Sequence, residues 1–172
     1  MNELLILYAL TKGQTTMYGL SKYIQKYFGF LTVPSFGTIQ PTIKKLENNK
    51  IIKTQKFITD GGKPYNSYTI TNEGITHLKS KMLEPFGKIP INIYSNIKIR
   101  FICADILDNS EKQSLYKMLK TELYKLKQNA EILQNNEFIK DNSSTNLVLD
   151  ATICEYKNMI EIIERFENAC NN

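Results

Sequence analysis

The sequence predicts a mainly α-helical protein with one small β-hairpin, arranged as two domains. Over most of the chain, apolar residues recur at spacings of three and four, which is typical of helices that bury one side. Residues 51–70 break this period with two runs rich in β-branched and aromatic residues on either side of a Gly-Gly turn. Pro85, Gly87 and Pro90 then interrupt the chain, so we expect domains at residues 1–84 and 91–172.

Two short helices are expected to begin the first domain. The apolar run Leu4–Leu10 predicts the first, which ends near Gly13. Thr15 or Thr16 caps the second, because a Thr side-chain oxygen accepts an unpaired N–H at a helix start. The second helix is expected to bury Leu20, Ile24, Tyr27 and Phe28. Lys22 lies off that side, toward solvent or phosphate.

A third helix is expected to open at Ser35 and to bury Ile39, Ile43 and Leu46. Asn48-Asn49 is expected to end it, because Asn tolerates the left-handed conformation found at helix ends. Pro41 has two readings. If the helix starts at Ser35, Pro41 lies beyond the first turn and costs one backbone hydrogen bond. If it starts at Thr38, Pro41 falls where N–H groups are unpaired anyway.

A β-hairpin follows this third helix. Residues 51–58 and 65–70 are the expected strands, and residues 59–64, with the sequence Thr-Asp-Gly-Gly-Lys-Pro, form the turn between them. Helix, strand, basic glycine turn and strand, in this order, are the pattern of a winged helix-turn-helix domain. We therefore expect the protein to bind double-stranded DNA.

The second domain is expected to be all-helical. Residues 93–104 form one helix, and Asp108–Glu111 mark a restart. From that restart to Leu133 we expect an amphipathic helix of about 35 Å at ~1.5 Å per residue, with apolar residues repeating from Leu115 onward. A polar connection, 141–146, leads to a last helix whose apolar surface is too wide for one neighbour. We expect a second copy of the chain to cover it, through Leu149, Ile153, Tyr156, Ile160 and Ile163.

The charge of the chain is uneven. Residues 1–80 carry ten Lys and four acidic residues, a net charge of +6, whereas residues 81–172 carry a net charge of −1. A basic half favours a polyanionic partner, although charge alone is equally typical of a basic soluble domain. The charge indicates DNA binding only because it coincides with the winged-helix pattern.

Several classes of function find no support in the sequence. There is no bilayer-length apolar run and no signal-peptide pattern, so we expect a cytoplasmic protein without membrane contact. The three Cys residues are widely spaced and form no zinc or disulfide pattern. No catalytic group is recognisable, and we expect no cofactor and no metal. Gly61-Gly62-Lys63 precedes a strand rather than a helix, so it is not a nucleotide-binding loop.

The candidate DNA contacts lie on the third helix and the hairpin. On the helix, the expected major-groove face carries Gln40, Thr42, Lys44 and Lys45. Gln can pair with adenine edges, and Lys with guanine or phosphate. Ser35 and Thr38 either cap the helix or donate a hydroxyl to phosphate. On the hairpin, Lys63 at the tip and its neighbour Tyr65 complete the set.

The first half resembles the PadR family of bacterial transcriptional regulators. The resemblance rests on an opening Leu-rich helix, Tyr18-Gly19-Leu20, the stretch Pro34–Pro41, the turn Gly61–Pro64, and Thr71–Gly74. The second half is similar, in helix pattern and length, to the C-terminal domain of the virulence-activator type. Gln40 replaces an aromatic residue usual in the family, and the turn is less basic than is common. Without Trp, an effector pocket of stacked Trp is not implied.

The resemblance implies a homodimeric transcription regulator, a repressor, that responds to a small-molecule or protein effector. Two recognition helices entering successive major grooves roughly 34 Å apart imply an inverted-repeat operator. Two other functions remain open. A replication or segregation protein of a plasmid or phage would bind arrays of short repeats, and a protein-interaction module would not be retained on DNA.

Overall fold

The computed structural model describes residues 1–170, which form two compact units that meet between Glu84 and Pro85. The N-terminal unit contains α1 (Asn2–Thr11), β1 (Thr15–Thr16), α2 (Met17–Phe28), α3 (Phe36–Asn48), β2 (Ile52–Ile58), β3 (Pro64–Ile70) and α4 (Asn72–Leu83). The C-terminal unit contains α5 (Pro90–Ile102), the 3-10 helix η1 (Cys103–Ile106), α6 (Asn109–Gln134), α7 (Glu137–Lys140) and α8 (Ser143–Cys170). No helix within residues 1–170 is long and apolar enough to span a membrane.

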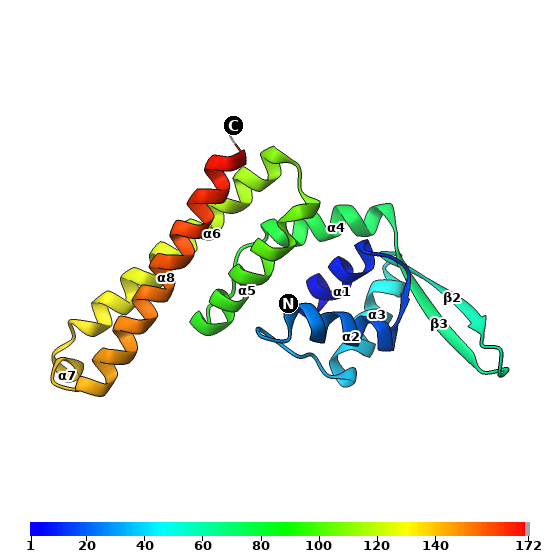
Figure 1. Ribbon diagram of the computed structural model, residues 1–172, viewed down its shortest axis with the longest axis horizontal. Coiled ribbons are helices and arrows are strands. Elements are labelled where there is room, and N and C mark those ends of the chain that lie inside the picture. The colour runs from blue at the N-terminus through cyan, green and yellow to red at the C-terminus, as the bar shows by residue number, and fades with distance from the viewer. Residues whose placement is uncertain (171–172) are drawn as a thin grey trace. The chain divides into compact units, whose positions relative to one another are not determined.

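The predicted fold class is confirmed: a mainly helical chain in which α3 is followed by a β-hairpin. β2 and β3 pair in antiparallel register from Ile52 opposite Ile70 to Ile58 opposite Pro64, and the hairpin projects from the helices of its unit (Figure 1). A third strand was not expected. β1 joins β3, so the strand order is β1-β3-β2 and α2 is tied to the base of the wing.

Helix α1 forms the centre of the N-terminal core. All seven residues of Leu4–Leu10 are buried, because α2, α3, β3 and α4 contact α1 from several sides. A helix that is apolar all round belongs in such a position. The predicted buried residues of α3 are confirmed, and so are those of α2 except Tyr27. Tyr27 is exposed and lies against Tyr23, because the buried residues of α2 follow one another every four positions and Tyr27 lies off that line.

The helix ends show which local signals were correct. Thr16 caps α2 by accepting the N–H of Gly19, and Thr71 caps α4 by accepting the N–H of Gly74. Helix α3 ends at Asn48 with Asn49 as its C-cap, so the predicted stop at Asn48-Asn49 is confirmed, but the left-handed conformation given as its reason is not found at either Asn. The left-handed residue after α3 is Lys50, with φ of 59°. The N–H of Lys50 donates to the carbonyl of Glu47, and the N–H of Ile51 donates to the carbonyl of Leu46, both in the last turn of the helix.

Helix α3 begins at Phe36, so Pro41 lies inside the helix, beyond its first turn. The first of the two readings of Pro41 therefore holds, and α3 forgoes one backbone hydrogen bond at this position.

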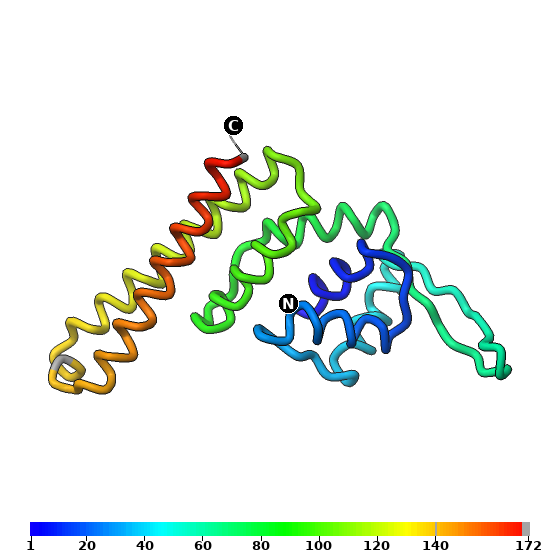
Figure 2. Tube along the Cα trace, viewed as in Figure 1, coloured from blue at the N-terminus to red at the C-terminus, as the bar shows by residue number. Residues whose placement is uncertain are grey.

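In the C-terminal unit, α6 and α8 lie side by side along most of their length, joined by α7 (Figure 2). Asp108 and Glu111 form a capping box at the start of α6, as the predicted restart requires. The expected polar connection, 141–146, is shorter than predicted. Helix α8 already begins at Ser143, because Asn142 accepts the N–H of Thr145 through its side chain.

The five residues predicted to form a dimer surface are already buried within one chain. None of Leu149, Ile153, Tyr156, Ile160 and Ile163 is more than 9% exposed. Helix α8 packs on α6, and it also contacts α5, where the rings of Tyr94 and Tyr156 lie 5.0 Å apart and those of Phe101 and Phe166 lie 5.2 Å apart. Within one chain, α5 is therefore a second neighbour of this apolar surface, and the expected contact of α8 with a second copy stays a prediction.

Candidate nucleic-acid interface

Helix α3 presents its polar side chains on two sides. Ile39, Ile43 and Leu46 hold the helix in the core, so residues between them in sequence flank the buried side. Gln40 and Lys44, one turn apart, are exposed and make no hydrogen bond or ion pair with any residue that the structure describes. Their amide and ammonium groups are therefore available to a partner.

Thr38 and Thr42 lie on the other flank, and their hydroxyl groups are already in use. The Thr38 hydroxyl donates to the carbonyl of Ser35 at 2.8 Å, and the Thr42 hydroxyl donates to the carbonyl of Thr38 at 2.8 Å. Each can still accept a hydrogen bond but has no proton left to donate to a phosphate. Ser35 occupies the N-cap position, yet its side chain makes no capping hydrogen bond and is exposed.

Lys45 belongs to a charged cluster between helices of the N-terminal unit. Its Nζ lies 3.5 Å from Oε2 of Glu3 on α1, and the Nε2 of His77 on α4 lies 2.5 Å from Oε1 of the same carboxylate. Burial by itself would raise the pKa of Glu3. The hydrogen bond with His77 and the charges of Lys45 and Lys81 outweigh burial, so the pKa of Glu3 lies below its ordinary value.

This cluster predicts a loss of stability in acid. Because the pKa of Glu3 is lowered on folding, its stabilising effect is complete above the ordinary value of 4.5 and is lost as pH falls through the lower folded-state pKa. Glu3→Gln should therefore lower Tm at neutral pH, and the two proteins should converge as the solution is acidified. Thermal unfolding followed by circular dichroism measures this. Glu47→Gln, at an exposed position of α3, should change Tm little at any pH.

The tip of the wing is a tight, polar turn. Thr59 accepts the N–H of Lys63 through its hydroxyl, and its own N–H donates to the carbonyl of Lys63. Gly62 has φ of 77°, a conformation that glycine adopts without strain. The turn holds the exposed side chain of Lys63 at the end of the hairpin, apart from α3, so the candidate contacts form two regions of one unit (Figure 1).

Behind the tip, Tyr65 stacks on Phe57 across the hairpin. The two residues are direct partners in the register, with ring centroids 5.6 Å apart and planes 23° apart, and both are exposed. Tyr65 is a predicted contact, whereas Phe57, its partner in the ring pair, is not. The register of the Gly-Gly hairpin, counted outward from its turn, would have indicated this pair.

Helix α2 adds one further basic position. Lys22 is exposed, with its Nζ 5.6 Å from the centre of the exposed Tyr18 ring. A Lys held over an aromatic ring keeps its charge at the surface while part of its stem is covered. Tyr18 belongs to the same exposed patch of α2 and was not among the predicted contacts.

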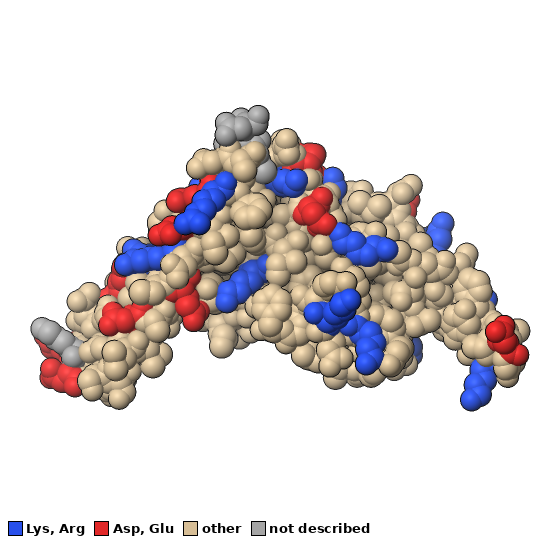
Figure 3. All heavy atoms as spheres, viewed as in Figure 1, with Lys and Arg blue, Asp and Glu red and all other residues tan. Residues whose placement is uncertain are grey.

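Positive charge predominates on the surface of the N-terminal unit, with a few acidic residues among the basic ones. In Figure 3, blue side chains are more frequent than red ones over the N-terminal unit, while the two colours alternate over α6 and α8. Two acidic residues accompany the candidate contacts. Glu47 lies on the flank of α3 that carries Gln40 and Lys44, and Asp60 lies in the wing turn near Lys63. Each of the two candidate regions therefore combines basic groups with one acidic side chain.

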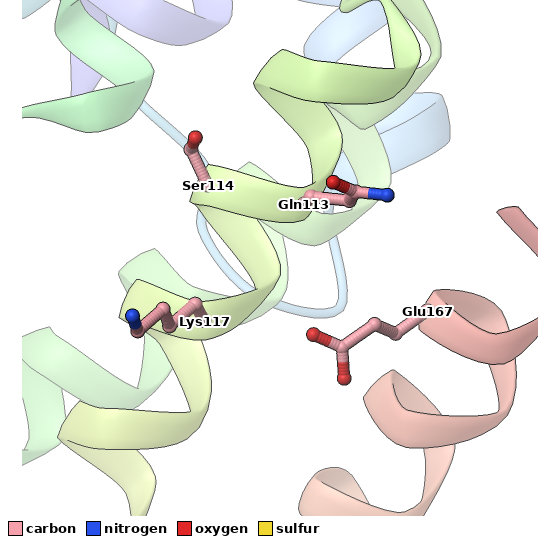
Figure 4. Close-up of a pocket in the computed structure, with 4 residues that line it drawn as sticks. All are labelled: Gln113, Ser114, Lys117 and Glu167. Carbon is pink, nitrogen blue, oxygen red and sulfur yellow. The ribbon is translucent and has the colours of Figure 1, made fainter. Parts of the chain in front are cut away.

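Two other features were considered as sites. An open hollow of about 420 Å³ is lined by Gln113, Ser114 and Lys117 of α6 and by Glu167 of α8. Figure 4 shows the Glu167 carboxylate directed toward α6. Lys120 of α6 forms an ion pair with this carboxylate. All four lining residues are polar. Within residues 1–170, no group of His, Cys, Asp or Glu side chains could hold a metal ion.

The match to a known protein family lies in the N-terminal unit. Residues 6–80 match the model of the transcriptional regulator PadR-like family. This segment contains β1, α2, α3 and the whole wing. None of the curated proteins compared with the chain matches it.

Solved structures of regulators also match. PadR of Bacillus subtilis in complex with operator DNA is 18% identical over 98% of this chain and 98% of that chain, with a TM-score of 0.47. A PadR-like transcriptional regulator from Bacillus cereus is 19% identical over 99% of this chain and 98% of that chain, with a TM-score of 0.42. A transcriptional regulator from Clostridium thermocellum is 32% identical over 46% of this chain and 76% of that chain, with a TM-score of 0.43.

Proposed function

Because residues 6–80 of this chain belong to the PadR-like family of transcriptional regulators, we propose that the protein binds an inverted-repeat operator as a homodimer and represses transcription there. The observation that carries the proposal is the exposed flank of α3, where the side chains of Gln40 and Lys44 make no hydrogen bond or ion pair with any described residue, together with a wing that ends in Lys63. A helix followed by a wing has the geometry to read a major groove and hold the adjacent backbone.

The two α3 side chains serve different purposes in this proposal. The Gln40 amide offers both donors and an acceptor, which match an adenine edge in the major groove. Lys44, one turn further, reaches guanine or phosphate. Thr38 and Thr42 act as acceptors or packing residues at the groove edge, since their hydroxyl protons are already donated to backbone carbonyls. The exposed Ser35 hydroxyl can still donate to a phosphate.

Phosphate contacts fix the position of the unit on DNA. Lys63 at the wing tip, Lys22 on α2 and Lys45 beside Glu3 are the basic groups assigned to this role. A homodimer places two copies of α3 in successive major grooves roughly 34 Å apart, hence the inverted repeat. A small-molecule or protein effector acts by favouring one spacing of the two wings over another.

Direct selection of genomic fragments by the purified protein tests the proposal. Fragments that share an inverted repeat upstream of genes support it, and sedimentation of the complex gives the number of protomers bound. Arrays of short repeats would point instead to a replication or segregation protein. Absence of any retained DNA would favour a protein-interaction module.

Affinity for DNA is expected to fall steeply with salt. Each phosphate neutralised contributes about 0.9 to the slope of log affinity against log salt. Fluorescence anisotropy of a labelled operator at several salt concentrations measures the slope. A slope near zero would show that DNA is not the partner that the basic unit binds.

Gln40→Ala and Lys63→Ala are expected to weaken DNA binding in different ways. Gln40→Ala should lose about 1–3 kcal/mol on the operator and change which bases matter, because a bidentate base contact is removed. Lys63→Ala should weaken specific and nonspecific DNA alike and reduce the salt slope by about one. Titrations against the operator and its point mutants separate the two outcomes.

The matched control is Lys157→Ala, which removes an exposed Lys of α8 and should leave both affinity and slope unchanged. An equal loss on every sequence from Gln40→Ala would contradict its assignment to base reading. A sequence-selective loss from Lys63→Ala would mean that the wing reads the minor groove.

A further inference from the structure

The C-terminal unit contains a partly enclosed hollow of about 220 Å³ between α5, α6 and α8. It lies at the start of α5, against the second half of α6 and the first half of α8. Its lining residues are Pro90, Leu126, Asn129, Ala130, Leu133, Leu149, Thr152 and Tyr156. All of them belong to one compact unit, so the hollow does not depend on the DNA-binding unit.

The walls are apolar and carry no charged side chain. Leu126, Ala130 and Leu149 form the buried part of the lining. An ionised ligand would lose its hydration in such a place without gaining a counter-charge, which costs far more than it returns. The lining therefore selects against ions and favours neutral molecules.

One polar group in the lining, the hydroxyl of a mostly buried tyrosine, is left without a hydrogen-bond partner among the described residues. Tyr156 is 7% exposed, and its hydroxyl makes no hydrogen bond to any residue that the structure describes. The neighbouring Tyr94 is different, because its hydroxyl donates to the carbonyl of Glu155 at 3.3 Å. Burial and the nearby Glu155 raise the pKa of Tyr156, so the hydroxyl is protonated and able to donate.

We propose that this hollow is a binding site for a small, neutral, mostly apolar molecule that carries one hydrogen-bonding group for Tyr156. An apolar cavity of about 150 Å³ is large enough to hold benzene, so 220 Å³ admits a substituted single ring. The role of such a molecule as an effector rests on the proposed regulatory function, whereas its binding to the hollow is independent of that function.

Binding can be tested with benzyl alcohol as the neutral probe and benzoate as an ionised probe of the same ring size. The full chain, labelled with carbon-13 in the Leu and Ala methyl groups, is titrated with each probe and followed by NMR. Benzyl alcohol should shift the methyl signals of Leu126, Ala130 and Leu149 in a saturable way. Benzoate should bind at least about tenfold more weakly, because its carboxylate gains no partner in the lining.

Two substitutions probe the site and one serves as a control. Ala130→Phe fills the hollow and should abolish the saturable shifts. Tyr156→Phe keeps the ring but removes the hydroxyl, and should weaken benzyl alcohol roughly three- to tenfold. Leu147→Ala changes a residue of α8 that is 70% exposed and outside the lining, and should leave the affinity unchanged. If Ala130→Phe fails to fold, the affinity of Tyr156→Phe for benzyl alcohol tests the site.

Several results would overturn the proposal. They are shifts that do not saturate, equal affinity for benzoate, and an unchanged affinity in Tyr156→Phe. Another would be dissociation of an oligomer by Ala130→Phe with no probe binding to the parent protein, because the hollow would then be an interface between copies of the chain. Operator binding is measured on the same samples. Loss of DNA binding with intact probe binding would contradict the proposed function alone, and the reverse would contradict this site alone.

Discussion

Ile160→Asp is expected to unfold the C-terminal unit. Ile160 is 5% exposed and lies in α8, which packs on α6. A carboxylate placed there has no counter-charge and must either unfold its surroundings or remain protonated at a high cost. We expect a loss of more than about 4 kcal/mol in the free energy of unfolding, which is at the upper end for a single substitution.

Ile162→Asp is the matched control, because Ile162 lies two residues further on the same helix and is 40% exposed. The same change there should cost less than about 1 kcal/mol. Urea unfolding by circular dichroism gives both values, and sedimentation gives the oligomeric state. A folded Ile160→Asp monomer of near-normal stability would contradict the packing within one chain and return Ile160 to an interface between copies.

Gly74→Ala is expected to destabilise the N-terminal unit, although Ala normally favours a helix over Gly by about 1 kcal/mol. A Cβ at position 74 would lie 2.2 Å from the carbonyl oxygen of Ile51 and 2.7 Å from the side chain of Ile70. That carbonyl cannot move freely, since it accepts the N–H of Thr71 at 3.1 Å. Relief of the clash would displace α4 from the sheet, at a cost of about 3 kcal/mol.

Gly37→Ala supplies the comparison within another helix. A Cβ at position 37 would meet only the Ser35 hydroxyl oxygen, at 3.7 Å, so the substitution should stabilise the protein by roughly 0.5 kcal/mol. Thermal unfolding of the two variants should therefore shift Tm in opposite directions. A rise in Tm for Gly74→Ala would mean that the approach of α4 to Ile51 is looser than the structure has it.

The elements whose signals are local could be predicted from the sequence. The wing follows from two β-rich runs around a glycine turn, and Gly62 adopts the positive φ that this turn needs. Thr71 and the pair Asp108 and Glu111 cap helices through side chains a few residues from the backbone groups they bind. The exposed positions of Gln40 and Lys44 follow equally from the period of the buried residues of α3.

Other features depend on contacts between residues that are distant in sequence, and no local sequence pattern predicts such contacts. The pairing of Thr15 with Tyr68 adds β1 to the sheet, and the ion pair of Lys45 with Glu3 turns one predicted DNA contact toward α1. The end of α3 lies at Asn48 as predicted, but the left-handed residue is Lys50 rather than an Asn, and that choice is set by where the chain must go next.

The apolar surface of α8 shows most clearly what a sequence pattern can and cannot predict. By itself the sequence determined which side of α8 is buried, since the period of a helix assigns each residue to a side. Only the tertiary structure decided what covers that side within one chain, namely α6 and α5. Burial of apolar surface is non-directional and does not depend on which partner excludes the water. A periodic pattern therefore predicts that a surface is covered, and the partner follows only from how the elements pack.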